Sequence, residues 1–134
     1  MTWSEPHLLD VEHLSADEVE QVMTLAGQMR EMLDRGSDPG PLLRGQHVAL
    51  LFAEPSTRTR LSFELAARRL SADTYLLDPP SSSMVKGETL ADTVRNLAAI
   101  GFTMLVVRHH RSGAPWVAQA SNWSSSVTSY HSSS

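Results

Sequence analysis

The chain has 134 residues, of which 41% are apolar and 19% charged, as is typical of one folded domain. Its net charge of −4 argues against general binding to nucleic acid, and no apolar run approaches the ~20 residues that span a bilayer. The absence of cysteine excludes disulfides and thiolate metal sites. Because the first residues lack the pattern of a signal peptide, we expect a cytoplasmic protein.

The first predicted helix begins with a capping box. Ser15 and Glu18 are spaced so that each side chain can accept a hydrogen bond from a backbone N–H of the first turn, and Gly36 is predicted to end the helix. Apolar residues recur at helical spacing in between, and we interpret this stripe as part of the core. The stripe consists of Val19, Val22, Met23, Ala26, Met29 and Leu33.

Helices and strands are predicted to alternate along the rest of the chain. The predicted strands are residues 48–52, 74–77 and 103–107, and the predicted helices after them are residues 56–70, 88–101 and 114–118. This alternation is typical of a parallel β-sheet flanked by helices, a three-layer α/β fold. We assign this domain to residues 1–120. Residues 121–134, of which eight are serine, show no periodicity, and we expect a disordered tail there.

Polar side chains stand where the first strand enters its helix. Ser56, Thr57, Arg58 and Thr59 occupy the start of that helix, where unpaired backbone N–H groups and the helix dipole favour an anion. Hydroxyls and a guanidinium at this place would give a phosphate group several directed hydrogen bonds. The alternative is an ordinary capped helix with solvated arginines.

Further candidate ligands follow the other two strands. Ser82 and Lys86 lie after the second strand and Arg108 follows the third. Because ligands of parallel sheets bind at the carboxyl ends of the strands, we expect these residues to converge with the helix start on one edge. Three cations with several hydroxyls suit a small phosphorylated substrate.

Other chemistries are not supported. The chain has neither a nucleotide P-loop nor the Gly-x-Ser-x-Gly elbow of serine hydrolases. His109 and His110 are adjacent, so on an extended chain their rings point to opposite faces and cannot easily share one ion. We therefore expect no metal and no cofactor.

Three stretches in the same order resemble known motifs. Residues 52–64, which include Ser-Thr-Arg-Thr-Arg at 56–60, closely resemble the carbamoyl-phosphate motif of transcarbamoylases. Residues 82–89 resemble the loop that aspartate transcarbamoylases insert into a neighbouring subunit's active site, and residues 107–114 resemble that family's third motif. Ornithine transcarbamoylases usually have His-Lys-Glu where this chain has Lys-Gly-Glu at 86–88, so aspartate is the better prediction and an ornithine-type enzyme the alternative.

The resemblance implies transfer of the carbamoyl group of carbamoyl phosphate to L-aspartate, a step of pyrimidine biosynthesis, without cofactor or metal. It implies that Ser56, Thr57, Arg58, Thr59 and Arg108 bind carbamoyl phosphate, with Arg58, Thr59 and Arg108 as the catalytic residues. In a homotrimer, Ser82 and Lys86 would act in the neighbouring subunit's site, and Lys86 would also contact L-aspartate. A regulatory or dihydroorotase-like partner chain would be compatible with the family.

The resemblance ends near Ala120. There the family continues with a His-Pro-x-Gln motif and an aspartate-binding domain, whereas this chain has its serine-rich residues. We therefore expect a truncated half of the enzyme, such as a frameshift produces, that is inactive alone. The other hypotheses are a non-catalytic homologue that keeps the anion site as an assembly or regulatory partner, and a plain α/β domain without a site.

Overall fold

The computed structural model describes residues 7–52, 57–77, 90–108 and 126–129. Within these ranges the chain forms a four-stranded sheet with strand order β2-β1-β3-β4, and every neighbouring pair is parallel. In chain order the elements are α1 (Ala16–Asp34), β1 (His47–Phe52), α2 (Thr57–Arg69), β2 (Asp73–Leu77), α4 (Leu90–Ile100), β3 (Met104–Arg108) and β4 (Ser126–Ser129).

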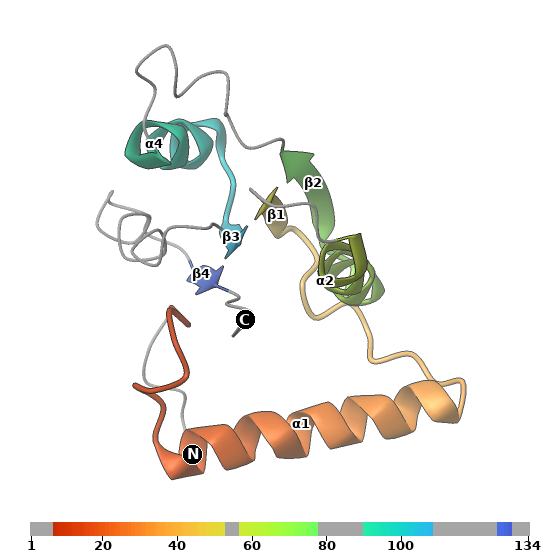
Figure 1. Cartoon of the computed structure of the whole chain (residues 1–134). Coiled ribbons are helices and arrows are strands. Elements are labelled where there is room, and N and C mark those ends of the chain that lie inside the picture. Colours follow the sequence, from red (N-terminus) through yellow and green to blue (C-terminus); the bar gives the residue numbers. More distant parts are fainter. Residues whose placement is uncertain (1–6, 53–56, 78–89, 109–125, 130–134) are drawn as a thin grey trace.

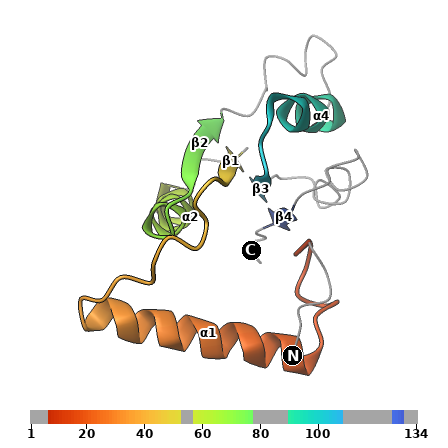
Figure 2. The same cartoon turned by 180° about the vertical axis from the view of Figure 1, so that it is seen from behind.

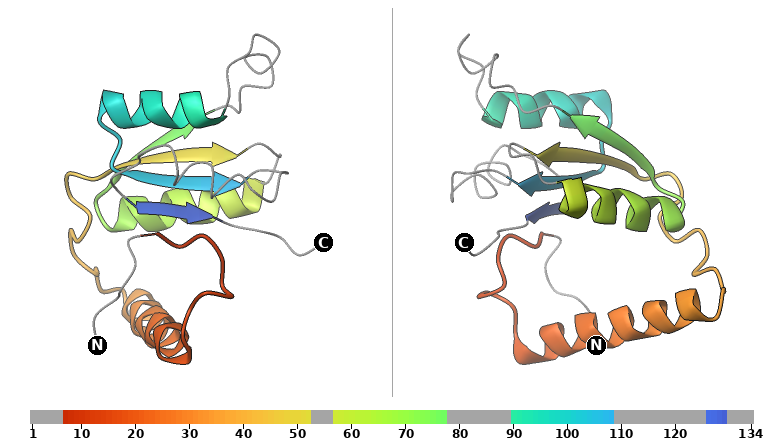
Figure 3. Two further views of the ribbon diagram at one scale, coloured as in Figure 1. Left: turned by 90° about the vertical axis from the view of Figure 1, so that its left-hand side faces the viewer. Right: turned by 45° about the vertical axis from the view of Figure 1, so that its right-hand side comes forward.

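The sheet is the middle of three layers. Figure 1 and the side view in Figure 3 show α4 covering one face of the sheet and α2 covering the other. This arrangement confirms the predicted parallel sheet flanked by helices. The predicted strands and the helix after β1 agree with the observed ones to within one residue at every boundary.

The core consists of two apolar clusters, one on each face of β1. Alternate residues of a strand point to opposite faces, and all of β1 after His47 is buried. A strand covered on both faces needs a continuous apolar run, which residues 48–52 provide. The cluster under α4 contains Ala49, Leu51, Val94, Leu97, Leu105 and Val107, and the cluster under α2 contains Val48, Leu50, Phe52 and Val106 with Phe63 and Ala67 against it.

The start of α1 is as predicted. The Ser15 hydroxyl accepts from the Glu18 N–H and the Glu18 carboxylate accepts from the Ser15 N–H, each at 3.1 Å. After Asp34 the chain turns through Gly36, whose φ of +71° is easily adopted only by glycine. These residues therefore fix both ends of α1 locally.

The prediction that the apolar stripe of α1 belongs to the core was wrong. No residue of α1 is buried, and Met23 is 66% exposed. Figures 1 and 2 show α1 beyond the three layers rather than on a face of the sheet. Helical spacing shows which side of a helix can be buried, but the surface that would bury it has to come from another element, and the described residues supply none.

The expectation of disorder over residues 121–134 was also wrong for four of them, because Ser126–Ser129 form β4 beside β3. The open edge of β3 offers unpaired backbone groups, and Val127 and Thr128 are β-branched residues that favour strands. The helix predicted at 114–118 lies outside the described residues. Among the described helices, none combines the length and apolar composition that crossing a bilayer requires.

Candidate functional site: the carboxyl edge of the sheet

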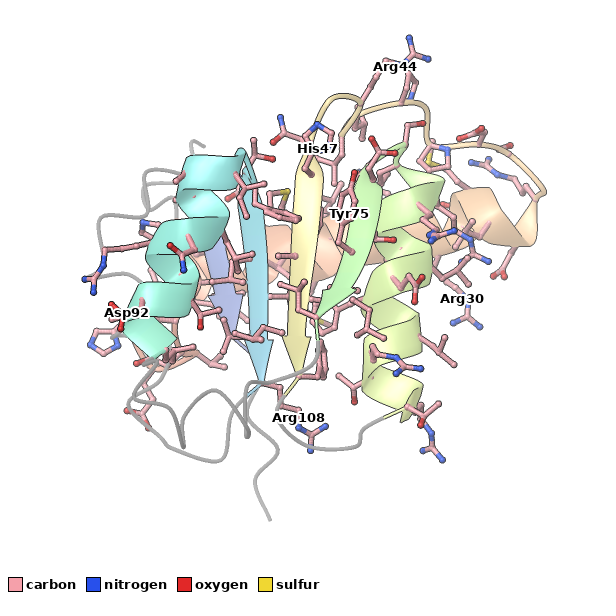
Figure 4. All side chains as sticks on the ribbon, turned by 90° about the horizontal axis from the view of Figure 1, so that it is seen from above. Arg30, Arg44, His47, Tyr75, Asp92 and Arg108 are labelled. Carbon is pink, nitrogen blue, oxygen red and sulfur yellow. The ribbon has the colours of Figure 1, made fainter. Side chains whose placement is uncertain are left out.

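The carboxyl ends of the three longer strands lie at one edge of the sheet. In the parallel register, Phe52 at the end of β1 is paired with Arg108 of β3, and Leu51 is paired with Leu77 of β2. Figure 4 shows Arg108 at this carboxyl edge, whereas His47, Tyr75 and Arg44 lie at the opposite edge. The register therefore brings the last residues of these three strands to the same side of the molecule.

The first turn of α2 is anchored over the end of β1. The rings of Phe52 and Phe63 lie in tilted contact with their centroids 6.4 Å apart. Because Phe63 lies in the second turn of α2, this contact fixes the position of the helix start. The Ser62 hydroxyl also donates a 2.8 Å hydrogen bond to the Arg58 carbonyl oxygen, which ties the two ends of this turn together.

A charged side chain meets the first turn of α2 from the neighbouring strand. The Arg108 guanidinium Nη1 lies 3.5 Å from the Thr59 hydroxyl oxygen, and both residues are partly buried. This is the outer limit of hydrogen bonding. Two predicted site residues that are 49 positions apart in the sequence are thus adjacent.

The helix geometry separates the other first-turn residues. A step of about 100° per residue places Thr59 and Arg60 on the side that carries Phe63 and Ala67 towards the sheet. Thr57 and Arg58 belong to the same turn but are exposed, so they lie on the side of the helix that faces solvent. This exposure leaves the Arg58 guanidinium accessible to a ligand.

The electrostatics of α2 favour an anion at its start. Its first turn contains no acidic residue, while its last turn contains Arg68 and Arg69. Helices commonly have carboxylates near the N-terminus, where they offset the partial positive charge of the dipole. Without one in the first turn of α2, that charge remains available to a bound anion, and Arg58 and Arg108 add to it.

The structure tests only part of the predicted convergence. It brings Thr59 and Arg108 together, and it places Thr57 and Arg58 on the same turn as Thr59. Ser56, Ser82 and Lys86 lie outside the described residues, and the roles of all the predicted site residues stay predictions. Arg60, which received no role from the sequence, has its Nε atom buried at this edge.

Other polar and concave features lie elsewhere. Among the described residues, no group of three or more His, Cys, Asp or Glu side chains is arranged to hold a metal ion. A groove of about 720 Å³ runs along α1, and one of about 460 Å³ lies at the amino edge beside His47 and Tyr75. Neither contains a residue of the candidate site.

One pair of groups with shifted pKa values lies before α1. His13 Nδ1 is 2.6 Å from an Asp10 carboxylate oxygen. This hydrogen bond lowers the pKa of Asp10 and, with the attraction of the carboxylate, raises the pKa of His13. Both groups lie at the surface, so the pair is a local contact outside the candidate site.

Known proteins resemble the chain in both sequence and structure. The aspartate carbamoyltransferase catalytic subunit of Opitutus terrae is 47% identical over 115 residues, which cover 86% of this chain and 37% of that protein. The catalytic subunit of M. jannaschii aspartate transcarbamoylase superposes with a TM-score of 0.83 at 33% identity, over 93% of this chain and 41% of that one. Aspartate transcarbamoylase from Trypanosoma cruzi, solved in complex with carbamoyl phosphate, has a TM-score of 0.80 at 32% identity, over 92% and 39%.

These shares mean that the chain spans little more than a third of the length of the relatives it matches. Residues 6–132 match the family model described as the carbamoyl-P binding domain of aspartate/ornithine carbamoyltransferase. The match continues past Ala120, further than the three motifs indicated. The chain therefore belongs to the aspartate/ornithine carbamoyltransferase family and corresponds to its carbamoyl-phosphate-binding domain.

Proposed function

We propose that this chain supplies the carbamoyl-phosphate half of an aspartate transcarbamoylase active site. The observation that carries the proposal is the contact of the Arg108 guanidinium with the Thr59 hydroxyl at the first turn of α2. A cation and a hydroxyl beside a helix start without acidic residues form a suitable site for the phosphate and the adjoining carbonyl oxygen of carbamoyl phosphate.

Each residue has a distinct task in this proposal. The first turn of α2, with Ser56, Thr57 and Arg58, binds the phosphate. Arg108 bridges the phosphate and the carbonyl oxygen, and the Thr59 hydroxyl donates to that oxygen. The amine of L-aspartate attacks the carbamoyl carbon and a tetrahedral intermediate forms. The bond from carbon to the phosphate oxygen then breaks, its electron pair leaves with the phosphate, and the leaving phosphate takes up the proton that the amine loses.

Catalysis then depends on position and charge. The groups hold the carbamoyl carbon in place for attack and stabilise the negative charge that develops on the carbonyl oxygen and the leaving phosphate. A single donor of this kind is typically worth ~3 kcal/mol of transition-state stabilisation. No covalent intermediate with the protein is required.

The remaining groups come from outside the described residues. We place the chain in a cytoplasmic homotrimer in which Ser82 and Lys86 of one subunit complete the site of the next, with Lys86 also contacting L-aspartate. The aspartate half is assigned to the part of the relatives' length that this chain does not span. A regulatory or dihydroorotase-like chain is compatible with this assembly.

A thermal unfolding experiment with carbamoyl phosphate tests the proposal. A ligand at 100 times its Kd stabilises a protein by about 2.7 kcal/mol, so the Tm of the wild-type chain should rise with ligand concentration. Arg108→Gln should abolish this rise, whereas Arg44→Gln should keep it, because Arg44 lies at the opposite edge of the sheet (Figure 4).

An assay for product formation from carbamoyl phosphate and L-aspartate separates the proposed function from the other hypotheses. The chain alone should bind carbamoyl phosphate but form no N-carbamoyl-L-aspartate. A Tm that is independent of carbamoyl phosphate would contradict the proposal. Stable co-purification with a full-length transcarbamoylase in fixed stoichiometry would instead favour the non-catalytic homologue that keeps the anion site as an assembly or regulatory partner.

A further inference from the structure

Arg60 carries a buried hydrogen-bond donor at the edge of the sheet where the candidate site lies. Its Nε atom is shielded from solvent and has no hydrogen-bond partner among the residues that the structure describes. A buried N–H group without an acceptor typically costs about 1–3 kcal/mol, so such groups are rare in folded proteins. An acceptor supplied in another state of the site would satisfy this donor.

Helix geometry predicts that the Arg60 guanidinium lies beside the site. Side chains on a helix lean towards its N-terminus, so a long side chain in the first turn reaches back to the carboxyl edge of the sheet. Thr59 faces β3, where it meets Arg108. Arg60, about 100° further around the helix, lies on the side of β2, which α2 also contacts.

The burial of Nε identifies the kind of acceptor. A diffusing anion cannot reach an atom that solvent cannot touch, whereas a backbone carbonyl can move against it when the chain rearranges. Closing of the first turn of α2 around a bound dianion would be a rearrangement of this kind. Thr59, which precedes Arg60, would be moved by the same change.

We propose that Arg60 is a positioning residue of the anion site, whose Nε–H gains a backbone carbonyl acceptor when carbamoyl phosphate binds. The inference rests on the proposed function. Arg60 acts through the first turn of α2, which it holds in the geometry that aligns the Thr59 hydroxyl with Arg108. A lysine keeps the charge but lacks the planar Nε–H donor, so Arg60→Lys separates this role from simple electrostatic attraction.

Nuclear magnetic resonance of the arginine side-chain Nε–H groups tests the inference on the wild-type chain. The resonance that disappears in Arg60→Lys is that of Arg60. On titration with carbamoyl phosphate its proton resonance should move downfield, as a new hydrogen bond requires. Arg60→Lys should bind carbamoyl phosphate about tenfold more weakly, and Arg69→Lys, at the exposed end of the same helix, should bind like the wild type.

The outcomes separate this inference from the proposed function. If the wild type binds carbamoyl phosphate but the Arg60 resonance does not move, the positioning role is wrong and the proposed function stands. A resonance that is already downfield without ligand would also overturn the inference, because the bond would then be static. If the wild type does not bind carbamoyl phosphate, the proposed function fails and the inference fails with it.

Discussion

The Arg108 guanidinium lies 3.5 Å from the Thr59 hydroxyl, so the last residue of β3 contacts the first turn of α2 across the end of β1. Two residues that are 49 positions apart meet there because Arg108 ends one parallel strand and Thr59 begins the helix that follows its neighbour. The contact is too long to contribute much to stability. The contact instead places the Thr59 hydroxyl and the Arg108 cation where one ligand can contact both.

Thr59→Val should therefore weaken binding of carbamoyl phosphate with little effect on folding. Valine keeps the shape of threonine but removes the hydroxyl, and a hydrogen bond to a charged ligand is worth about 1.5–3 kcal/mol, or roughly tenfold or more in Kd. Thr59→Ser, which keeps the hydroxyl, should bind close to the wild type. Equal affinities for the two variants in a calorimetric titration would show that the hydroxyl is not a ligand.

Ser15→Ala should destabilise α1 without destabilising the core. Loss of an N-cap typically costs about 1 kcal/mol, but no residue of α1 is buried, so the loss should remain local. Amide hydrogen exchange in the first turn of α1 should become about five times faster, while the Tm hardly changes. Ser37→Ala, beyond the other end of α1, is the matched control. A Tm lower by several degrees would mean that α1 unfolds together with the sheet.

Leu105→Ala should destabilise the whole domain. Leu105 is fully buried in β3 between the sheet and α4, and leucine-to-alanine changes in cores cost about 2–5 kcal/mol. Urea denaturation measures the loss. Ile100→Ala is the control, because Ile100 is 74% exposed and its truncation should cost less than about 0.5 kcal/mol. Similar losses for both variants would contradict the assignment of the core.

The Asp10–His13 contact should respond to pH in a defined window. The His13 contribution is complete below its ordinary pKa of 6.5 and is lost as pH rises through its raised folded pKa. The Asp10 contribution is present above its ordinary pKa of 3.8 and is lost as pH falls through its lowered folded pKa. The pair is therefore strongest between these two ordinary values.

Nuclear magnetic resonance titration of His13 measures this coupling. Asp10→Asn should lower the pKa of His13 towards 6.5, because the carboxylate that raises it is removed. Asp38→Asn, in the loop after α1, should leave the pKa of His13 unchanged. A His13 pKa that is the same in the wild type and in Asp10→Asn would show that the contact does not form in solution.

The sheet could be predicted well because each strand is indicated by a short run of neighbouring residues in the sequence. An unbroken apolar run such as 48–52 suits only a strand covered on both faces, and alternation with helices makes the strands parallel. The same reasoning placed Thr59 and Arg108 at one edge. It could not choose which side chains would meet there, because that depends on the register of Phe52 with Arg108.

The predictions that failed concern features that depend on contacts with another part of the fold. The stripe that includes Val22 and Met23 has the spacing of a core helix, but its burial depends on a second surface that periodicity does not describe. β4 is only four residues long and forms against the open edge of β3, so its own composition gives a weak signal. The buried Nε of Arg60 depends on the packing of α2, which no motif records.

A calorimetric titration of the chain with carbamoyl phosphate tests the central claim most directly. The wild type should bind at one saturable site. Arg58→Ala should lose this binding while it remains folded by circular dichroism, because Arg58 is exposed, and Arg69→Ala should bind like the wild type. Binding that is unchanged in Arg58→Ala, or a folded wild-type chain that takes up no ligand, would contradict the account.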